Sequence, residues 1–408
     1  DNKNILLLNQ QGQIDDWTNY IGQVSWLLFL RYLESIESDR RDQALLESKE
    51  YIPILDKEYR WDQWACPKNG LGVRDDTRAM KGDDLIDFVN RELFPYFRSF
   101  KKEGSKGSVQ YQIASIFERL ENKFENGHRL REALDRIDDL EFNTNNQRDE
   151  LGNIYEGMLQ NLNNKGSGKG EYYTPRPLIR AMVSVTNPQI GETVYDGACG
   201  TCGFLYEAYK FMKKDNISVE EMKTLQRNTF HGQELKPYGY LFGVMNMILH
   251  GIDNPNIVRT NTLSTSLSAI TEDDRHDVVL MNPPFGSGVP ENEQNNFQFK
   301  SSEMGYLFMQ HIIKKIKAGG RAAVIIKNTF LSNGDAKNIR KLLLEKCKVH
   351  TILNMPQGSF LGATVKTVVL FFEKGRPTKK IWYYDLDPGR SLGKINPLND
   401  NDLKVLCH

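Results

Sequence analysis

Residues 277–285 read Asp-Val-Val-Leu-Met-Asn-Pro-Pro-Phe, a strand-like apolar run that ends at two prolines. Each proline removes a backbone donor and fixes φ, so the strand ends on a rigid rim of carbonyl groups. In open α/β sheets, this carboxyl edge is where ligands bind. The side-chain oxygen of Asn282 and the carbonyl of Pro283 can together accept both protons of an exocyclic amine, and Phe285 offers a flat face to a planar base. The alternative is a proline-terminated strand end with no role beyond the fold.

A glycine-rich turn lies upstream of this stretch. Residues 192–196 resemble a short strand, residues 197–203 read Gly-Ala-Cys-Gly-Thr-Cys-Gly, and a helical pattern follows. Strand, glycine-rich turn and helix form the layout of a nucleotide-cofactor loop. A second strand, expected at 228–233, leads into Glu234, whose carboxylate suits two hydrogen bonds to ribose hydroxyls. The acid follows the loop by about thirty residues rather than the usual twenty, and the intervening polar segment can absorb the difference.

The remaining pattern predicts a doubly wound α/β sheet. Helices are expected between the earlier strands, including 237–250 and 305–316. Further strands are expected at 256–259, 277–281, 321–327, 349–354 and 366–373. A short loop without room for a crossover helix separates the last two, so we expect them to form an antiparallel pair. A peripheral strand is expected at 381–386.

An all-helical region precedes the sheet. Apolar residues recur at helical spacing in residues 16–46, and further helices are expected at 85–100, 109–124, 129–140 and 148–162. These helices are either a docking module that closes over a ligand or an ordinary bundle core. Residues 161–170 have the composition of a linker. The predicted organisation is a helical domain at 1–145, an α/β domain at 146–390 and the start of a C-terminal tail at 391–408.

Composition limits the possible partners. The 408 residues contain 53 basic and 53 acidic side chains, which gives a net charge of zero. A DNA-binding protein that works alone usually has a basic excess. Any affinity for DNA must therefore come from a local basic patch or from a partner protein.

The five cysteines are scattered apart from Cys199 and Cys202. Their Cys-x-x-Cys spacing is found in redox pairs and in halves of zinc sites. However, the pair lies within the glycine-rich turn, and Cys66, Cys347 and Cys407 supply no second pair. The longest apolar patch, residues 26–30, is too short to span a bilayer. We therefore expect no metal site, no membrane association and a reducing cytoplasmic location.

Together these motifs resemble the N6-adenine DNA methyltransferases that use S-adenosylmethionine, and more narrowly the modification (M) subunit of type I restriction–modification systems. The resemblance extends from the N-terminal helices to about residue 400, and its most specific parts are 170–176, the loop after Asp196, 282–285 and 319–331. The family's usual loop has proline where this chain has Gly197, and a small residue where it has Cys202, which would add bulk near the methionine end of the cofactor. Neither change removes a needed donor. The resemblance implies a Rossmann-like methyltransferase sheet with an antiparallel last strand, behind a helical N-terminal domain.

The resemblance also implies a set of cofactor contacts. The methionine end of S-adenosylmethionine would lie against Glu171, Tyr172, Tyr173, Thr174, Pro175 and Arg176. Its amino and carboxylate groups would be held by the loop residues Asp196, Ala198, Gly200, Thr201, Cys202 and Gly203. Glu234 would take the ribose hydroxyls, and Asn261 would meet the cofactor adenine.

The catalytic set implied by the resemblance is Asn282, Pro283, Pro284 and Phe285. A target adenine cannot reach such a pocket inside a duplex, so it must be flipped out. Asn282 and the Pro283 carbonyl would hold its N6 amine while Phe285 stacks on the ring. In-line transfer of the sulfonium methyl group then needs positioning and desolvation, and no general base is expected. Phe330 either supports the base pocket or belongs to the core.

Two other functions use similar motifs. Protein glutamine N5-methyltransferases carry an Asn-Pro-Pro-aromatic motif, but usually with tyrosine and without a large helical N-terminus. A non-enzymatic scaffold would not need the intact residues 282–285 and Glu234.

The resemblance implies several partners in addition to double-stranded DNA. The sheet is expected to be complete by about Lys374, which leaves fewer than the ~50 residues of even a small recognition domain. Base readout would therefore come from a separate specificity (S) subunit. The resemblance adds a second copy of this chain in an M2S1 complex and a nuclease–translocase (R) subunit for restriction, in a prokaryotic cytoplasm.

Overall fold

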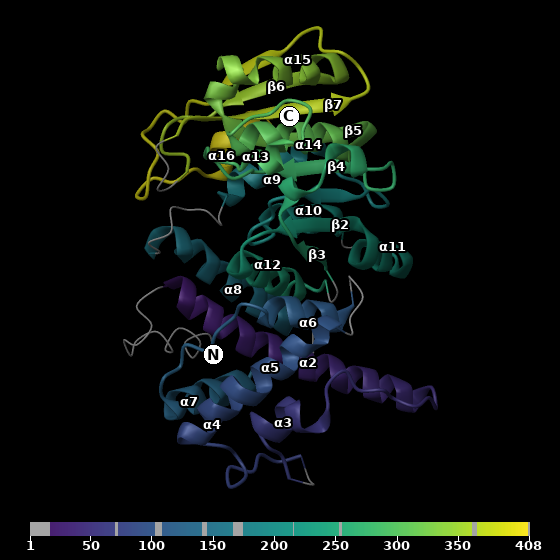
Figure 1. Cartoon of the computed structure of the whole chain (residues 1–408), viewed down its shortest axis with the longest axis vertical. Helices are drawn as coiled ribbons and strands as arrows, with labels where there is room; N and C mark the ends of the chain where they lie inside the picture. Colours follow the sequence, from purple (N-terminus) through teal and green to yellow (C-terminus); the bar gives the residue numbers. More distant parts are fainter. Residues whose placement is uncertain are drawn as a thin grey trace. The chain divides into compact units, whose positions relative to one another are not determined.

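The computed structural model describes residues 17–69, 72–102, 108–140, 145–165, 174–214, 216–252, 255–360 and 365–406. The chain divides into two compact units. The first comprises Asp1–Leu159 with Ile248–Gly251, and the second comprises Gln160–Met247 with Ile252–His408. Figure 1 shows the first as the purple and blue helices and the second as the teal to yellow sheet with its own helices.

The first unit is helical, as the sequence predicts. Its α-helices are α2 (Trp17–Leu46), α3 (Trp61–Trp64), α4 (Gly82–Phe88), α5 (Phe94–Ser99), α6 (Val109–Phe117), α7 (Gly127–Asp138) and α8 (Asn145–Lys165), whose last residues belong to the second unit. A π-helical turn, Val89–Leu93, joins α4 to α5, so the helix expected at 85–100 is continuous but irregular. Aromatic packing holds the bundle together: Trp26 of α2 meets Phe94 of α5 edge-on, with ring centroids 5.3 Å apart.

The helix expected at 109–124 is wrong in its second half, because α6 ends at Phe117. Arg98 donates from Nε to the Phe117 carbonyl oxygen and from Nη2 to that of Leu120, at 2.9 Å each. Gln23 of α2 then donates to the Glu121 carbonyl oxygen. Side chains from other helices thus satisfy carbonyl groups that a longer helix would have satisfied itself.

The linker expected at 161–170 is also wrong in part, because α8 continues to Lys165. Residues 166–170 lie outside the described residues. Polar residues such as those at 161–165 occur in helices as well as in linkers, so composition alone does not separate the two conformations.

Within the described residues of the second unit, eight strands form one sheet. The strands are β1 (Val194–Asp196), β2 (Phe230–Glu234), β3 (Asn256–Arg259), β4 (His276–Met281), β5 (Ile316–Lys327), β6 (Cys347–Asn354), β7 (Thr367–Lys374) and β8 (Trp382–Asp385). Their order is β3-β2-β1-β4-β5-β7-β6-β8. The five strands from β3 to β5 are parallel, and β7 runs antiparallel between β5 and β6. The doubly wound sheet and its antiparallel final pair are confirmed, and β8 is the expected peripheral strand.

Helices cover the sheet. They are α9 (Arg176–Thr186), α10 (Gly203–Met212), α11 (Val219–Thr224), α12 (Pro237–Leu249), α13 (Glu291–Gln294), α14 (Met304–Lys315), α15 (Lys337–Lys346) and α16 (Asp400–Leu403). Val279 and Met281 of β4 pack into one core cluster with α14 residues such as Leu307. Because side chains alternate along a strand, Val278 and Leu280 face the opposite layer, where α9 and α10 contact the central strands. None of the helices in the described part of the chain combines the length and apolar character needed to cross a bilayer.

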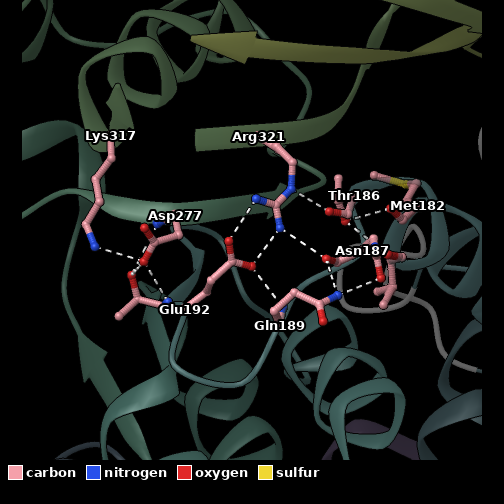
Figure 2. A network of polar contacts seen from close by, with 10 residues as sticks. Met182, Thr186, Asn187, Gln189, Glu192, Asp277, Lys317 and Arg321 are labelled. Atoms are coloured by element: carbon pink, nitrogen blue, oxygen red, sulfur yellow. Dashed lines mark hydrogen bonds and ion pairs between the residues drawn. The ribbon is translucent and has the colours of Figure 1, made fainter. Parts of the chain in front are cut away.

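Strand β5 begins at Ile316, five residues before the start at Arg321 that the sequence predicts. Its register with β4 shifts near this end, so the residues before Arg321 form an irregular insertion. A side chain on Gly320 would lie 2.8 Å from the Asp277 carbonyl oxygen, so the two strands approach too closely there for any other residue. Beside this irregularity, Arg321 and Lys317 join a network of ion pairs at the amino edge of the sheet (Figure 2).

Candidate active site

A cavity opens at the carboxyl edge of the parallel strands, where the sequence predicts a ligand. It encloses about 350 Å³ of empty space, part of it open to solvent. Strands β1 and β4 are parallel neighbours, so their ends bring Asp196 and Asn282 to the same rim. The cavity is lined by Thr174, Arg176, Ile179, Asp196, Ala198, Cys199, Gly200, Thr201, Gly203, Phe204 and Asn282.

The glycine-rich loop needs unusual backbone conformations. Gly200 has φ +49°, and Cys202, which precedes α10, has φ +58°, a left-handed conformation that non-glycine residues rarely adopt. A side chain on Gly203 would lie 1.6 Å from Nη1 of the buried Arg176 guanidinium. The absence of a side chain on Gly203 lets the Arg176 guanidinium of α9 approach the first turn of α10.

Asp196 is a buried carboxylate at the head of the loop, with 1% of its surface exposed. Its Oδ1 accepts a hydrogen bond from the Ala198 N–H at 3.0 Å. Burial raises the pKa of Asp196 to about 8, although the Ala198 bond opposes this rise. A cation entering the cavity would favour the ionised carboxylate.

Glu234 lies behind the loop rather than on the cavity wall. Its Oε2 accepts a hydrogen bond from the Gly200 N–H at 2.8 Å, and its Oε1 accepts one from the Lys236 N–H at 2.7 Å. Burial raises the pKa of Glu234, and these backbone bonds partly offset that rise. A carboxylate has about four lone-pair sites, so both oxygens keep acceptor capacity.

Asn282 is held on one side only. Its Nδ2 donates to the Thr174 hydroxyl at 3.0 Å, which fixes the orientation of the amide. Its Oδ1 is buried, yet it has no hydrogen-bond partner among the described residues. An unpaired buried acceptor costs about 1–3 kcal/mol, so its retention beside a cavity indicates a ligand that donates an N–H or O–H.

The other members of the Asn-Pro-Pro-Phe stretch differ in exposure. Pro283 is buried, Pro284 is exposed and Phe285 is half-buried, so part of the Phe285 ring remains available for contact. Phe330 is 1% exposed and packs on Tyr306 with ring centroids 5.7 Å apart, within the core cluster. Phe330 therefore belongs to the core.

Several predicted site residues do not line the cavity. Asn261 caps a short 3-10 helix: its Oδ1 accepts from the Leu263 N–H at 3.0 Å, and its Nδ2 donates to Glu293 Oε1 at 2.9 Å. Pro175 precedes α9 and also lies off the cavity wall. Glu171, Tyr172 and Tyr173 fall outside the described residues.

Both cysteines of the loop are buried. Cys202 is fully buried, and its Sγ faces α12, where a side chain on Gly243 would lie 2.6 Å from the sulfur. Cys202 is not among the residues that line the cavity. A hydrogen bond to Cys202 and burial raise the pKa of Cys199 well above its ordinary value, so its thiol stays protonated and unreactive. Within the described ranges, no three His, Cys, Asp or Glu side chains are grouped to hold a metal ion.

Sequence reasoning missed three residues of the cavity wall: Ile179, Cys199 and Phe204. Ile179 follows Arg176 by three positions on α9, so helical spacing places both on one face. Phe204 and Cys199 adjoin residues that the glycine loop already indicated. The periodicity of α9 was the available signal, but that helix was not predicted.

Comparison with known proteins agrees with this geometry. The N-6 DNA Methylase family matches residues 146–407, and the HsdM N-terminal domain matches residues 7–137. The methylase subunit of the type I restriction enzyme EcoEI from Escherichia coli is 35% identical over 408 residues, which cover 98% of this chain and 80% of that protein.

Solved structures give the same result. A chain from a study of complex assembly and conformational transition of the type I R-M system has a TM-score of 0.87 and 36% identity, and the match covers 99% of this chain and 80% of that one. A modification subunit of a putative type I restriction enzyme from Vibrio vulnificus has a TM-score of 0.80 and 33% identity, over 99% and 86%. The chain therefore belongs to the N6-adenine DNA methyltransferase family, among the methylase subunits of type I restriction enzymes.

Proposed function

We propose that this chain transfers a methyl group from S-adenosylmethionine to N6 of an adenine flipped out of double-stranded DNA. The observation that carries the proposal is the buried, unpaired Oδ1 of Asn282, on the same cavity wall as Asp196. Asp196 suits a cationic amine of a cofactor, and Asn282 suits an amine that must donate a hydrogen bond.

The residues around the cavity fit S-adenosylmethionine. Asp196 would accept from the cofactor's amino group, whose positive charge would favour the ionised carboxylate. The N–H groups at the start of α10 and the nearby Arg176 suit a carboxylate. Glu234 would accept from the ribose hydroxyls while it holds Gly200 in place. Asn261 would contact the cofactor adenine. Residues 171–173 and 175 would contact the methionine end of the cofactor and complete the proposed site.

Chemistry at the amine depends on Asn282 and Pro283. S-adenosylmethionine, when bound, supplies an electrophilic sulfonium methyl group. Thr174 keeps Nδ2 of Asn282 occupied, so Oδ1 is the atom presented to the substrate amine. The amine would donate one hydrogen bond to Oδ1 and one to the Pro283 carbonyl. These two bonds would direct the nitrogen lone pair away from the base ring. Pro284 stiffens this arrangement, and Phe285 stacks on the flipped base.

Sequence recognition is assigned to a partner, because the chain has no net charge with which to attract DNA by itself. A specificity subunit would read the bases, with two copies of this chain in an M2S1 complex and a nuclease–translocase subunit added for restriction. The helical domain at 1–145 would close over DNA and dock partners, the domain at 146–390 would catalyse transfer, and the segment from 391 would help bind the specificity subunit. As a DNA-modifying subunit related to bacterial enzymes, the chain would act in the cytoplasm.

The test has two arms. Calorimetry of the chain alone should show binding of S-adenosylmethionine or of its demethylated product. The chain, purified with its cognate specificity subunit and incubated with unmethylated host DNA, should form N6-methyladenine detectable by mass spectrometry. Methylation of a protein glutamine, or cofactor binding without any methyladenine in the complex, would refute the proposal.

A further inference from the structure

The Asn-Pro-Pro-Phe stretch is fixed differently at its two ends. At its start, Asn282 continues from β4 and is bonded to Thr174. At its end, Phe285 leads into Gly286, whose φ of +138° is a conformation that other residues rarely adopt. Pro283 and Pro284 make the middle of the stretch rigid. The position of Phe285 therefore depends on how both ends of the stretch are fixed.

Gly286, at the second end of the stretch, is bonded to the start of α14. The Gly286 N–H donates to Glu303 Oε1 at 3.2 Å, and the Gly286 carbonyl oxygen accepts from the Met304 N–H at 2.9 Å. Glu303 is the residue that precedes α14, and its own N–H donates to the Ser301 hydroxyl at 3.1 Å. The turn before α14 therefore fixes the backbone that carries the Glu303 carboxylate.

The same carboxylate oxygen receives a cation from the sheet. Lys327 Nζ lies 2.9 Å from Glu303 Oε1, and each side chain is 21% exposed. Lys327 is the last residue of β5, the parallel neighbour of β4. The pair therefore links the end of β5 and the start of α14 to the backbone that follows Phe285.

We propose that Glu303 is a positioning residue for methyl transfer, which acts through the Gly286 N–H to place Phe285 and the two prolines, and that Lys327 holds the Glu303 carboxylate in place. This inference rests on the proposed function. A hydrogen bond to an ionised acceptor is stronger than one between neutral groups, so the tether resists displacement of the loop. Displacements of about 1 Å in an active site can slow a reaction about 100-fold.

The experiment uses the complex with its cognate specificity subunit and measures single-turnover formation of N6-methyladenine. Glu303→Ala should slow transfer by about 10- to 100-fold, with the affinity for S-adenosylmethionine changed by less than about twofold. Glu303→Gln retains an acceptor for the Gly286 N–H and should recover most of the rate. Lys327→Met should lie between the two. The matched control is Glu291→Ala, which removes an exposed partner of Lys300 and should leave the rate unchanged.

A wild-type rate in Glu303→Ala would overturn the inference. Equal losses in Glu303→Ala and Glu303→Gln would overturn it too, because glutamine keeps an acceptor for the Gly286 N–H and should restore the tether. Amide hydrogen exchange supplies a second readout that needs no methyl transfer. Exchange in residues 285–289 should accelerate in Glu303→Ala and stay near wild type in Glu303→Gln. If wild type forms no methyladenine, the proposed function fails, and exchange unchanged by Glu303→Ala would refute the tether separately.

Discussion

The two edges of the sheet differ in how far their polar side chains are paired. At the amino edge, Arg321 donates to both carboxylate oxygens of Glu192, at 2.9 and 2.6 Å, and to the carbonyl oxygens of Thr186 and Asn187 (Figure 2). Lys317 pairs with Asp277 at 2.8 Å. At the carboxyl edge, and counting only the residues that the structure describes, the acceptor of Asn282 has no partner. Within the same residues, Asp196 accepts one bond, from the Ala198 N–H to its Oδ1.

The pKa shifts follow this difference. The hydrogen bond from Arg321 lowers the pKa of Glu192 below its ordinary value. Burial acts to raise the pKa of Asp277, but bonds from Lys317 and Thr193 outweigh it and lower the pKa. Burial of Asp196 is not offset in this way, and its pKa rises to about 8. Satisfied charges hold a fold together, whereas underpaired buried groups beside a cavity indicate a place for a ligand.

The largest expected effect is at Asn282. Asn282→Ala removes the acceptor for the target amine and should abolish methyl transfer, while affinity for S-adenosylmethionine stays nearly unchanged. The matched control is Asn354→Ala, because Asn354 also ends a strand but bonds to Asp385 instead of facing the cavity. Tritiated-methyl transfer by the complex measures both variants. Wild-type activity in Asn282→Ala would show that the unpaired acceptor at the carboxyl edge has no role in methyl transfer.

A smaller effect is expected at Glu234. Glu234→Ala should weaken binding of S-adenosylmethionine by about 1.5–3 kcal/mol, the range for hydrogen bonds to a charged group. The loss has two sources, the ribose contacts and the support of Gly200. Calorimetry of Glu192→Ala serves as the comparison, since that carboxylate lies at the opposite edge and should not affect affinity. Equal affinities in Glu234→Ala and wild type would remove Glu234 from the site.

A substitution at the amino edge of the sheet should change the stability of the fold rather than the affinity for the cofactor. Arg321→Met removes four hydrogen bonds from a side chain that is 26% exposed, and we expect the free energy of unfolding to fall by about 1–3 kcal/mol. Affinity for S-adenosylmethionine should not change. Chemical denaturation and calorimetry measure the two quantities. Reduced affinity without reduced stability would contradict the structural role of this network.

Measured per pH unit, the smallest effect is a pH dependence from Asp196. Its folded pKa of about 8 lies above the ordinary 3.8, so between these values the folded, ligand-free protein binds more protons than the unfolded chain. Stability should therefore fall as pH rises through this window, by at most about 1.4 kcal/mol per pH unit. Asp196→Asn should flatten the slope in denaturation experiments. Cofactor binding near neutral pH should release protons, which calorimetry in buffers of different ionisation enthalpy can detect.

Local sequence patterns were sufficient for most of the architecture. Apolar runs, prolines and glycines predicted the strands from residue 194 to residue 374 and the antiparallel final pair, because strand ends and tight turns depend on nearby residues. The same local logic placed Asp196 and Asn282 at strand ends. That these two side chains line one cavity follows from the parallel pairing of β1 with β4.

Other features depend on residues far apart in the sequence. The end of α6 at Phe117 depends on Arg98 and Gln23, and the early start of β5 depends on its bulged pairing with β4. Propensity cannot predict these, because the competing hydrogen bonds come from other elements.

By itself, the sequence determined the type of chemistry at this edge of the sheet: an amide and two prolines after a strand, and an acid and glycines after another. Only the tertiary structure decided which polar atoms stay unpaired. Glu234 turned out to bond Gly200 from behind the loop, Asn261 became a helix cap, and Glu303 met Gly286. The reason is physical: residue type sets what a group can donate or accept, whereas packing sets whether a partner reaches it.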